Sequence, residues 1–432
     1  MEFISTRDTS HAVPLSDALS QGLAPDGGLY VPASFPSVDP AALDEHNAIE
    51  EIAEEVLRPY FVGDELEDEL AAICRETFSF PTPLRALKDE TAVLELFHGP
   101  TAAFKDVGAR FLASGLSRLN EGARQPVTIL VATSGDTGAA VAAAFYEKPN
   151  VEVVVLYPKG RVSERQEKQL TGWDQNVQTL AVRGDFDDCQ RLVKAAFQDE
   201  ILRERYRLSS ANSINIGRLL PQMTYYAAAS IWYEREQGTA PGFIVPSGNL
   251  GNALAAMYAR AMGLPVREVV MATNENRPVT AYLSTGDPQA FETRETLATA
   301  MDVGNPSNME RLRHHWPSVE ELRTFVSADR VGDEAIAAQI RRGPDAWDTV
   351  WDPHTATAVA LREHLDTSHW VIVATAHPAK FDTVVEPLIG ETVPVPDSLA
   401  AVMARAQPVP EIEPSLSALR DALPSESAAS GD

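Results

Sequence analysis

The sequence predicts an α/β fold built around a largely parallel sheet, and two kinds of observation lead to that class. Residues 127–146 and 242–263 each read as an apolar strand, a glycine-containing turn and a helix. Residues 151–158, VEVVVLYP, form an almost continuous apolar run, which is typical of a strand buried on both faces of a parallel sheet. Because ligands of such sheets bind at the carboxyl ends of the strands, we expect the functional site at these turns.

The chain has 432 residues, more than one hydrophobic core usually holds, so several structural units are expected. We predict an N-terminal unit over residues 1–90 and a catalytic region over residues 91–408. A smaller α/β subdomain is expected within the second region, at about residues 105–210. Residues 409–432 are rich in Pro, Ser, Ala and Glu, and this composition predicts a flexible C-terminal tail.

The N-terminal unit and the catalytic region differ in the order of their predicted helices and strands. In the first, the turn formers of residues 22–28 precede a short strand, and apolar residues at helical spacing predict helices over 48–61 and 64–78. Pro81 and Pro83 then interrupt the chain. In the second, strands and helices alternate. Besides the segments named above, strands are predicted at 91–97, 266–274 and 370–381, and a helix begins near Lys105.

Acidic residues greatly outnumber basic ones, 62 against 36, which gives a net charge of −26. Nucleic acids and anionic membranes bind clustered positive charge, so we expect neither as a partner. A small anionic substrate is compatible with this charge, because a few local cations can override the field of the whole molecule. The charge therefore limits the partners without excluding a phosphorylated metabolite.

Three features indicate a cytoplasmic protein without a metal. The first residues, MEFISTRDTSHAV, have neither the basic nor the apolar region of a secretory signal. No run of 18 apolar residues is present, so no membrane span is expected. Cys74 and Cys189 lie far apart in sequence, and neither the cysteines nor the histidines have a metal-binding spacing. We expect two reduced cysteines and no metal site.

Lys105 is a candidate for chemistry because lysine is rare in this chain: seven occur, and most of the basic residues are arginines. It follows HGPTAAF, at the start of a predicted helix. A neutral lysine amine can attack a carbonyl carbon, which arginine cannot do, so one interpretation is a Schiff-base lysine. The alternative is a solvated lysine in the first turn of a helix.

Three polar stretches are candidate anion sites. In PSGNLGN, residues 246–252, two glycines let backbone N–H groups approach a ligand at a helix start, which suits a phosphate; the alternative is a tight turn without a ligand. In TSGDTG, residues 133–138, hydroxyls beside free N–H groups suit a carboxylate; the alternative is helix capping by Asp136 or Thr137. NSINIGR, residues 212–218, is either an anion clamp or an ordinary polar loop. Together these elements describe an enzyme that holds pyridoxal phosphate, an amino acid and another phosphate.

At this point the chain resembles the threonine synthase family, of the longer bacterial and fungal type, within the β-family (fold type II) of pyridoxal-phosphate enzymes. The resemblance extends from about residue 2 to residue 390. Six motifs occur in the family's order: Ser5-Thr6-Arg7 with GLAPDGGLYVP, then HGPTAAFKD, ATSGDTG, PSGNLGN, MDVGNPSNMERL and ATAHPAKF. The resemblance implies a large domain with a parallel sheet, a smaller α/β subdomain and an N-terminal extension domain.

The resemblance also implies roles for individual residues. Lys105 matches the lysine that bonds the cofactor, and Thr375 matches the hydroxyl residue that faces the pyridine nitrogen. The residues expected to contact the cofactor are Lys105, Asp136, Gly248, Asn249, Leu250, Gly251, Asn252 and Thr375. The substrate carboxylate is expected at Ser134, Gly135 and Thr137, and the substrate phosphate at Ser213, Asn215 and Arg218.

The implied reaction converts O-phospho-L-homoserine and water to L-threonine and phosphate by γ-elimination and β-addition, as the last step of threonine biosynthesis. Lys105 is expected to act as the base at Cα and then at Cβ. The nearest rival is a lyase like serine/threonine dehydratase, which would need neither NSINIGR nor the long N-terminal unit. A protein that binds phosphorylated ligands without turnover is a further alternative, which the intact Lys105 motif disfavours. A monomer or homodimer is expected.

Overall fold

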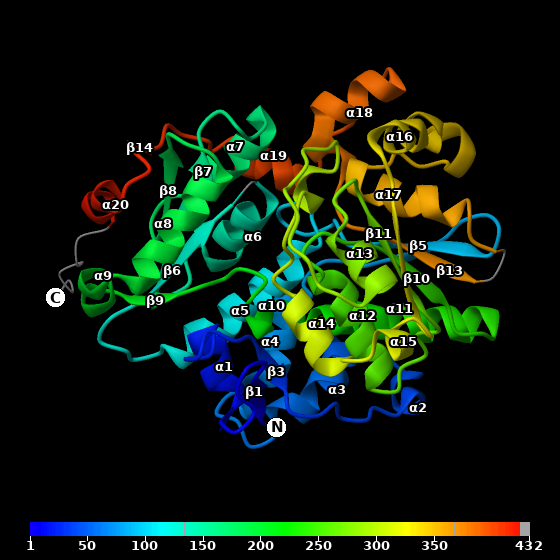
Figure 1. The fold of residues 1–432 in the computed structure, drawn as a ribbon, viewed down its shortest axis with the longest axis horizontal. Helices are drawn as coiled ribbons and strands as arrows, with labels where there is room; N and C mark the ends of the chain where they lie inside the picture. Colours follow the sequence, from blue (N-terminus) through cyan, green and yellow to red (C-terminus); the bar gives the residue numbers. More distant parts are fainter. Residues whose placement is uncertain (134, 367–368, 424–432) are drawn as a thin grey trace.

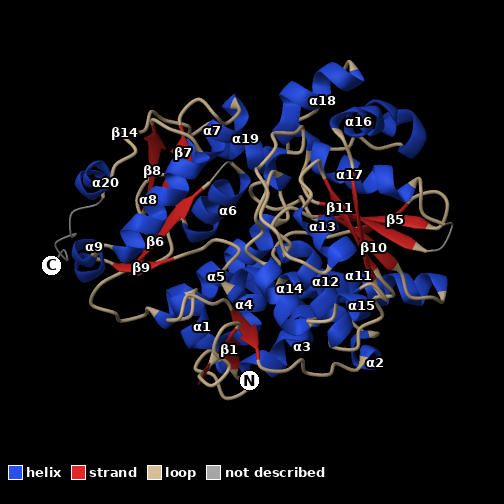
Figure 2. Ribbon diagram, viewed as in Figure 1, coloured by secondary structure: helices blue, strands red, loops and turns tan. Residues whose placement is uncertain are grey.

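Three sheets organise the chain in the computed structural model, which describes residues 1–133, 135–366 and 369–423 (Figure 1). A small antiparallel sheet has the strand order β2-β1-β3, a six-stranded sheet has the order β12-β11-β10-β13-β5-β4, and a five-stranded sheet has the order β14-β8-β7-β6-β9. Figure 2 shows the two larger sheets side by side, each with helices packed around it. The α/β class, the parallel sheet and the smaller subdomain are confirmed.

The N-terminal unit consists of a small sheet and a group of helices that pack beneath the rest of the molecule in Figure 1. Helices α3 and α4 pack on each other, and α3 also packs on α11 (Gln222–Gln237). The second predicted helix begins later than expected, because Asp64 accepts a hydrogen bond from Leu66 N and holds a turn there. The elements of this unit are β1 (Phe3–Ser5), β2 (Ala12–Val13), α1 (Leu15–Gln21), β3 (Tyr30–Pro32), α2 (Pro40–Leu43), α3 (Ile49–Phe61), η1 (Glu67–Glu69) and α4 (Leu70–Thr77).

The six-stranded sheet is parallel except for the β4–β5 pair. Its successive residues point to opposite faces. Phe243 and Val245 pack in one apolar cluster with α12 (Gly251–Ala261), whereas Ile244 packs in a second cluster with α17 (Pro353–Arg362), so both faces are covered. The strands are β4 (Leu84–Ala86), β5 (Thr91–Glu95), β10 (Gly242–Pro246), β11 (Val269–Thr273), β12 (Val326–Arg330) and β13 (Trp370–Ala374).

The helices around this sheet are α10 (Ile216–Leu219), α11 (Gln222–Gln237), α12 (Gly251–Ala261), α13 (Pro278–Thr285), η2 (Thr299–Met301), α14 (Met309–His315), α15 (Val319–Leu322), α16 (Asp333–Trp347), α17 (Pro353–Arg362), η3 (Pro378–Phe381) and α18 (Asp382–Ile389). Helix α5 (Lys105–Leu119) contacts α1, α4, α10 and α6 (Asp136–Phe145). It therefore connects the N-terminal unit with both larger units.

The five-stranded sheet is entirely parallel and is also covered on both faces. Ile129 and Val131 belong to the same cluster as α6, while Leu130 packs with α8 and α20. The elements are β6 (Val127–Ala132), α6 (Asp136–Phe145), β7 (Val151–Pro158), α7 (Glu164–Thr171), β8 (Val177–Val182), α8 (Phe186–Gln198), α9 (Glu200–Arg205), β9 (Arg207–Ser209), α19 (Asp397–Met403), β14 (Glu411–Ile412) and α20 (Leu416–Ala422).

The expectation of a flexible tail from residue 409 is wrong for the part of it that the structure describes. Strand β14 pairs with β8, and α20 buries Leu419 completely. Ile412, Leu419 and Leu423 join the core of the five-stranded unit, because their apolar side chains lie on one side of a segment whose average composition is polar. The expectation for residues 424–432 falls outside the described residues.

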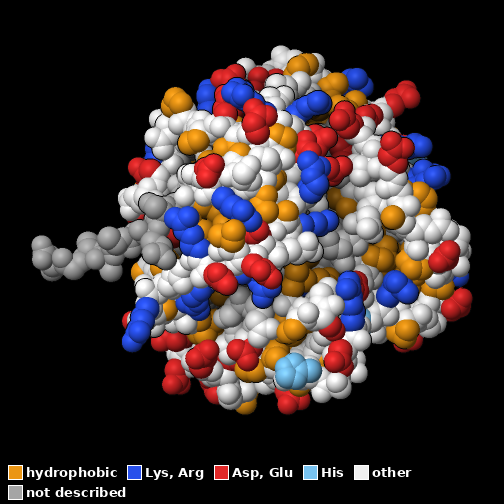
Figure 3. Space-filling model, turned by 60° about the vertical axis from the view of Figure 1, so that its left-hand side comes forward, with side chains coloured by type: hydrophobic (Ala, Val, Ile, Leu, Met, Phe, Trp, Pro, Cys, Tyr) orange, Lys and Arg blue, Asp and Glu red, His pale blue; other side chains and the backbone are white. Residues whose placement is uncertain are grey.

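The surface carries the acid excess of the sequence. On the face drawn in Figure 3, acidic side chains are frequent along the lower margin, at the level where Figure 1 places the N-terminal unit. Among the described helices, none is long and apolar enough to cross a membrane. No group of three or more metal-ligating side chains gathers anywhere in the described part of the chain.

Candidate functional site

Lys105 lies at the carboxyl end of the six-stranded sheet, as the first residue of α5. The segment before it runs beside the end of β13. Ala103 forms an antiparallel bridge with Ala376, and Phe104 N donates to Thr375 O at 2.9 Å. The sheet therefore brings Lys105 and Thr375 into one region, although 270 positions separate them in the sequence.

The loop before α5 is closed by Asp106. Its carboxylate accepts hydrogen bonds from Thr101 N at 2.9 Å and from Thr101 Oγ1 at 2.6 Å, and the aspartate is 1 % exposed. A Cβ atom on Gly99 would lie 2.5 Å from Asp106 Oδ2, so only glycine fits there. Gly99, Thr101 and Asp106 thus explain the local pattern of HGPTAAFKD: they fix the point at which the helix begins and Lys105 emerges.

The side chain of Lys105 is only 16 % exposed, so the alternative of a solvated lysine is wrong. Its Nζ lies 3.9 Å from Asp136 Oδ2, and it donates no hydrogen bond to any residue that the structure describes. Burial lowers the pKa of Lys105; Asp136 opposes this shift, while Lys380 and Arg218 add to it. A lysine with lowered proton affinity in a closed site is suited to nucleophilic attack and to base catalysis.

Asp136 is the first residue of α6, in the TSGDTG turn. The side-chain cap of this helix comes from Thr133, whose Oγ1 accepts from Gly135 N and Gly138 N, both at 2.9 Å. Capping by Asp136 or Thr137 is not what the structure has, because the N-cap residue of α6 is Gly135, with no side-chain bond. The expectation for Ser134 falls on a residue outside the described part of the chain.

Gly135 has a backbone conformation that strongly favours glycine, with φ at 142°. A Cβ atom there would also lie 2.7 Å from Gln166 Nε2, at the start of α7. The turn is therefore packed tightly against the neighbouring helix. This packing places the carboxylate of Asp136 on the side of the turn where Lys105 lies.

The carboxylate of Asp136 is 5 % exposed and lies between two lysines. Its Oδ1 is 3.2 Å from Lys380 Nζ, on the side opposite the contact of Oδ2 with Lys105. Burial acts to raise the pKa of Asp136, but Lys380, Lys105 and His354 outweigh it and lower the pKa to about 2. Asp136 is thus a fixed anion at neutral pH.

The PSGNLGN turn joins β10 to α12. Leu250, its N-cap residue, is in the left-handed region with φ at 66° and makes no side-chain cap. The first N–H groups of a helix have no partner within it, so those of α12 stay available to a ligand. A Cβ atom on Gly248 would lie 2.7 Å from Met301 Cα, which explains the glycine.

Polar side chains beside this turn fit a phosphate group. Asn252 Oδ1 accepts hydrogen bonds from Tyr225 at 2.7 Å and from Tyr226 at 2.8 Å, while its Nδ2 is buried without a partner in the described chain. Ser247 Oγ is likewise buried and unpartnered among the described residues. Buried polar groups without partners are costly, and a bound phosphate would satisfy both. The residues present therefore fit the phosphate of a cofactor.

The NSINIGR loop lies against the same turn. Asn249 Nδ2 donates to Ser213 Oγ at 2.6 Å. Arg218 is 4 % exposed; its guanidinium bonds Ala211 O, and its Nε has no partner in the described part of the chain. Burial lowers the pKa of Arg218 to about 10. Ser213 thus contacts the turn, and Arg218 is near enough to Lys105 to affect its pKa.

Asn215 differs from the two other residues of this loop. It is the N-cap of α10, with Oδ1 accepting from Gly217 N at 2.9 Å. Its amide donates to Leu19 O at 2.9 Å and to Ser210 O at 3.2 Å. Both amide hydrogens are therefore used, and Asn215 holds the loop on the N-terminal unit. Asn215 therefore supports the loop in the structure, whereas the sequence predicts that it contacts the substrate.

Several residues that shape the site were not among the sequence-predicted ones. Thr133 caps the aspartate turn, and Lys380 contacts Asp136. Arg311 is fully buried and donates to Ser213 O and Ile214 O, so it holds the NSINIGR loop from α14. All three stand in quoted motifs, ATSGDTG, ATAHPAKF and MDVGNPSNMERL. The rarity of lysine was a usable signal for Lys380, and the cap by Thr133 is a local contact within its turn; the contacts of Arg311 depend on the fold.

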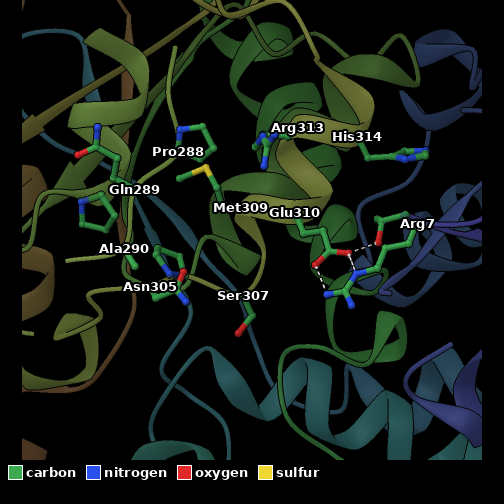
Figure 4. A pocket seen from close by; sticks show the side chains of 13 residues that line it. Arg7, Pro288, Gln289, Ala290, Asn305, Ser307, Met309, Glu310, Arg313 and His314 are labelled. Carbon is green, nitrogen blue, oxygen red and sulfur yellow. Dashed lines mark hydrogen bonds and ion pairs between the residues drawn. The ribbon is translucent and has the colours of Figure 1, made fainter. Parts of the chain in front are cut away.

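A surface cavity of about 660 Å³ lies beside α14 (Figure 4). Arg7 and Glu310 form a paired contact at 2.9 and 3.1 Å on its wall. Ser307, also on the wall, donates its N–H to Asn249 Oδ1 at 2.6 Å. The residues around it are Thr6, Arg7, Pro278, Pro288, Gln289, Ala290, Asn305, Pro306, Ser307, Met309, Glu310, Arg313 and His314. Because Lys105 and Asp136 are absent from its wall, this cavity lies outside the lysine site.

Comparison with known proteins gives the same picture. The profile "Pyridoxal-phosphate dependent enzyme" matches residues 76–376, "Threonine synthase N terminus" matches residues 2–78, and "Threonine synthase, C-terminal" matches residues 355–423. Threonine synthase from Escherichia coli (strain K12) is 41 % identical over 410 residues, which cover 93 % of this chain and 94 % of that protein.

Two solved structures cover almost the whole chain. The structure of pyridoxal-phosphate-bound threonine synthase from Brucella melitensis has a TM-score of 0.90 and 33 % identity, and covers 98 % of both chains. The structure of threonine synthase from yeast has a TM-score of 0.90 and 32 % identity, and covers 98 % of this chain and 97 % of that one. The chain belongs to the threonine synthase family and is a lyase with pyridoxal phosphate as its cofactor.

Proposed function

We propose that the chain converts O-phospho-L-homoserine and water to L-threonine and inorganic phosphate. The observation that carries this proposal is the presence of two anion-binding features around one buried lysine. One is the PSGNLGN turn, and the other is Arg218; the polar groups of both include atoms that have no partner among the described residues. An enzyme for an amino acid without a phosphate would need only the first.

Pyridoxal phosphate would be held by Lys105 at its aldehyde end and by residues 247–252 at its phosphate end. Thr375 would face its ring nitrogen. The backbone N–H groups at the start of α12, with Asn252 Nδ2 and Ser247 Oγ, supply the donors for the phosphate. When bound, the cofactor withdraws electrons from the bonds at the substrate's α-carbon.

Lys105 moves the protons of the reaction. With the cofactor bound, the free amine of Lys105 would take a proton from the substrate's Cα and later from Cβ. The lowered pKa of Lys105 supports this role, because a base must be neutral near the working pH. Asp136 stays anionic beside it and stabilises the protonated lysine between steps.

Ser213 and Arg218 would bind the phosphate group of the substrate, which departs as inorganic phosphate. A guanidinium binds phosphate oxygens more strongly than a neutral donor does, and burial strengthens the contact. Gly108 lies one helical turn after Lys105, and a Cβ atom there would be 2.5 Å from Arg218 O. Close packing on α5 therefore sets the place of Arg218 relative to the lysine.

The test is an assay of both products from purified enzyme, added cofactor and phosphohomoserine. We expect threonine and phosphate in equal amounts, and loss of both in Lys105→Ala. Phosphate with a keto acid in place of threonine would overturn the proposal and indicate a dehydratase-like lyase. No product from phosphohomoserine, with the cofactor bound, would overturn the assigned substrate.

We also propose a cytoplasmic location. Cys74 and Cys189 are buried as free thiols, and burial raises the pKa of each to about 12. Unpaired, unreactive thiols are usual in a reducing compartment. Fractionation of cells that produce the full-length chain would test this location.

A further inference from the structure

Lys380 is completely buried, which is unusual for a lysine, and it lies where the two larger units meet. It belongs to η3, which follows β13 of the six-stranded sheet. Its Nζ donates to Thr101 O at 2.6 Å, in the loop before α5, and to Gln169 Oε1 at 2.7 Å, on α7. The third neighbour is Asp136 Oδ1 at 3.2 Å, on α6.

The oxygens around Lys380 Nζ favour its charged form. An ammonium group has three hydrogens, whereas a neutral amine has two and a lone pair. Thr101 O and Gln169 Oε1 each accept a hydrogen bond from Lys380 Nζ, and Asp136 Oδ1 lies 3.2 Å away as its ion-pair partner. A neutral amine that donates to both acceptors would turn its lone pair toward the carboxylate, which the ammonium form avoids. Lys105 contacts the other oxygen of the same carboxylate at 3.9 Å and has no hydrogen bond within the described chain.

We propose that Lys380 is a positioning residue: its ammonium is the permanent counter-charge of Asp136, so that Lys105 can give up its proton while the Asp136 carboxylate stays ionised and buried. This proposal deepens the proposed function and rests on it for the role of Lys105. A single lysine beside Asp136 would have to remain charged to balance the buried anion. The second lysine removes that requirement, because the pair of Asp136 and Lys380 is neutral by itself.

The other charged groups around Lys105 and Asp136 agree with this assignment. Arg218 is the remaining cation that affects Lys105, and it also favours the neutral amine. His354 lies near Asp136, but its Nε2 accepts a hydrogen bond from Ala300 N at 3.0 Å, while its Nδ1 lies 2.8 Å from Asp352 Oδ1. Both ring nitrogens of His354 are thus engaged with Ala300 and Asp352, so within the described chain the histidine does not take the place of Lys380 beside Asp136.

The experiment compares the wild type with Lys380→Met, which keeps the length and removes the charge. Full-length protein freed of cofactor is treated with an amine-reactive reagent over a range of pH, and modification of Lys105 is followed by peptide mass spectrometry. Only the neutral amine reacts, so the rate reports the proton on Lys105 without any turnover. Near neutral pH we expect Lys380→Met to slow the modification of Lys105 by about three- to tenfold, because loss of a nearby like charge favours the protonated lysine.

Arg165→Met is the matched control. Arg165 also joins α7 to the η3–α18 segment, through Asp382 at 3.0 Å and Glu386 at 3.4 Å, without touching Asp136. We expect this variant to leave the pH dependence of Lys105 modification unchanged. An equal shift in both variants would mean that loosening of the interface, rather than charge, causes it, and would overturn the proposal. An unchanged Lys105 in Lys380→Met would overturn it as well.

A second measurement keeps the proposal testable if Lys380→Met does not fold. The chain has only seven lysines, so the Nζ signals of wild-type protein labelled with ¹⁵N-lysine can be assigned by single replacements at the other positions. We expect the signal of Lys380 to stay that of an ammonium throughout the pH range in which Lys105 titrates. Loss of a proton by Lys380 before Lys105 would contradict the proposal. In the holoenzyme, the activity profile of Lys380→Met should move to higher pH, a shift that a merely structural role would not produce.

Discussion

The turn at residues 246–252 and the turn at residues 133–138 both join a buried parallel strand to a helix, yet their polar groups are used in different ways. In the first, α12 has no side-chain cap, and Ser247 Oγ and Asn252 Nδ2 are buried without partners among the described residues. In the second, Thr133 Oγ1 accepts two of the backbone N–H groups, and Asp136 places a negative charge at the helix start.

This difference separates a phosphate turn from a charge-bearing turn. The N–H groups of α12 are open to an anion, and no acidic side chain stands in its first turn. At α6, Asp136 already occupies the favourable place of an anion and is balanced by Lys105 and Lys380. Both turns contain glycines. We assign the cofactor phosphate to the first turn because its donor groups have no partners among the described residues, whereas those of the second turn are capped by Thr133.

The largest expected effect comes from the lysine that faces the aspartate turn. Lys105→Ala should lower turnover by at least about 10²–10⁴-fold, because the variant loses both the attachment of the cofactor and the base. The measurement is the rate of threonine formation, together with borohydride reduction of the loaded protein and peptide mapping. Lys168→Ala, an exposed position on α7, is the control and should keep the rate and the cofactor on Lys105. Turnover of phosphohomoserine by Lys105→Ala would refute the assigned mechanism.

The next largest effect is expected from a substitution that disturbs the phosphate turn alone. Gly248→Ala should weaken pyridoxal phosphate binding by about tenfold or more, because its Cβ would lie 2.7 Å from Met301 Cα and the turn must shift. Binding of pyridoxal, which has no phosphate, should change much less. Gly115→Ala on α5 is the matched control, since its nearest neighbour would be a side-chain atom at 3.4 Å. Equal loss for both ligands in Gly248→Ala would count against a phosphate at this turn.

A smaller effect is expected from the cap of the aspartate turn. Thr133→Val keeps the shape but leaves Gly135 N and Gly138 N without their acceptor, which should lower the free energy of unfolding by about 1–2 kcal/mol. Pyridoxal phosphate affinity of the folded protein should change little. Thr128→Val is the matched control, because Thr128 Oγ1 is buried without a partner in the described chain. Denaturant unfolding checks both, and an equal cost for the two would contradict the capping role.

The smallest effect concerns the segment that carries Lys380. Burial, helped by His98, lowers the pKa of His377 to about 4, so the folded protein binds its proton less readily than the unfolded chain, whose histidine titrates near 6.5. Stability from this group is present above pH 6.5 and is lost as the pH falls toward 4, by up to about 1.4 kcal/mol per pH unit.

His377 Nδ1 accepts from Ala379 N at 3.2 Å, so protonation also removes the cap of η3. His377→Asn keeps an acceptor that does not titrate. Unfolding measured across this range should therefore depend less on pH in the variant, with the phosphate turn unaffected. An unchanged pH dependence would show that His377 does not titrate on unfolding.

Local patterns were enough to predict much of the fold. The run at 151–158 is strand β7 with the same bounds, and the predicted helix at Lys105 is α5. Period-two and period-3.6 patterns report local structure directly, and glycine turns mark the ends of strands. Strand β14 and helix α20 were missed, because pairing with β8 across more than 200 residues decides their structure.

The site was also predictable where it depends on local sequence, and not where it depends on tertiary contacts. Lys105 and the two turns follow from local sequence, whereas the place of Lys380 depends on how the two larger units meet. The substrate role of Asn215 was the natural expectation for a polar loop. Its contacts with Leu19 O and Ser210 O show instead that tertiary hydrogen bonds engage it. A sequence motif does not show which of its polar groups will remain without a partner in the folded protein.

The most direct measurement is a crystal structure of the holoenzyme with pyridoxal phosphate. The account predicts that the cofactor phosphate lies at residues 248–252, within hydrogen-bond distance of Asn252 Nδ2, with Lys105 bonded to the cofactor and Asp136 beside it. A phosphate bound at residues 133–138 in place of the first turn, or a cofactor joined to any other lysine, would contradict it.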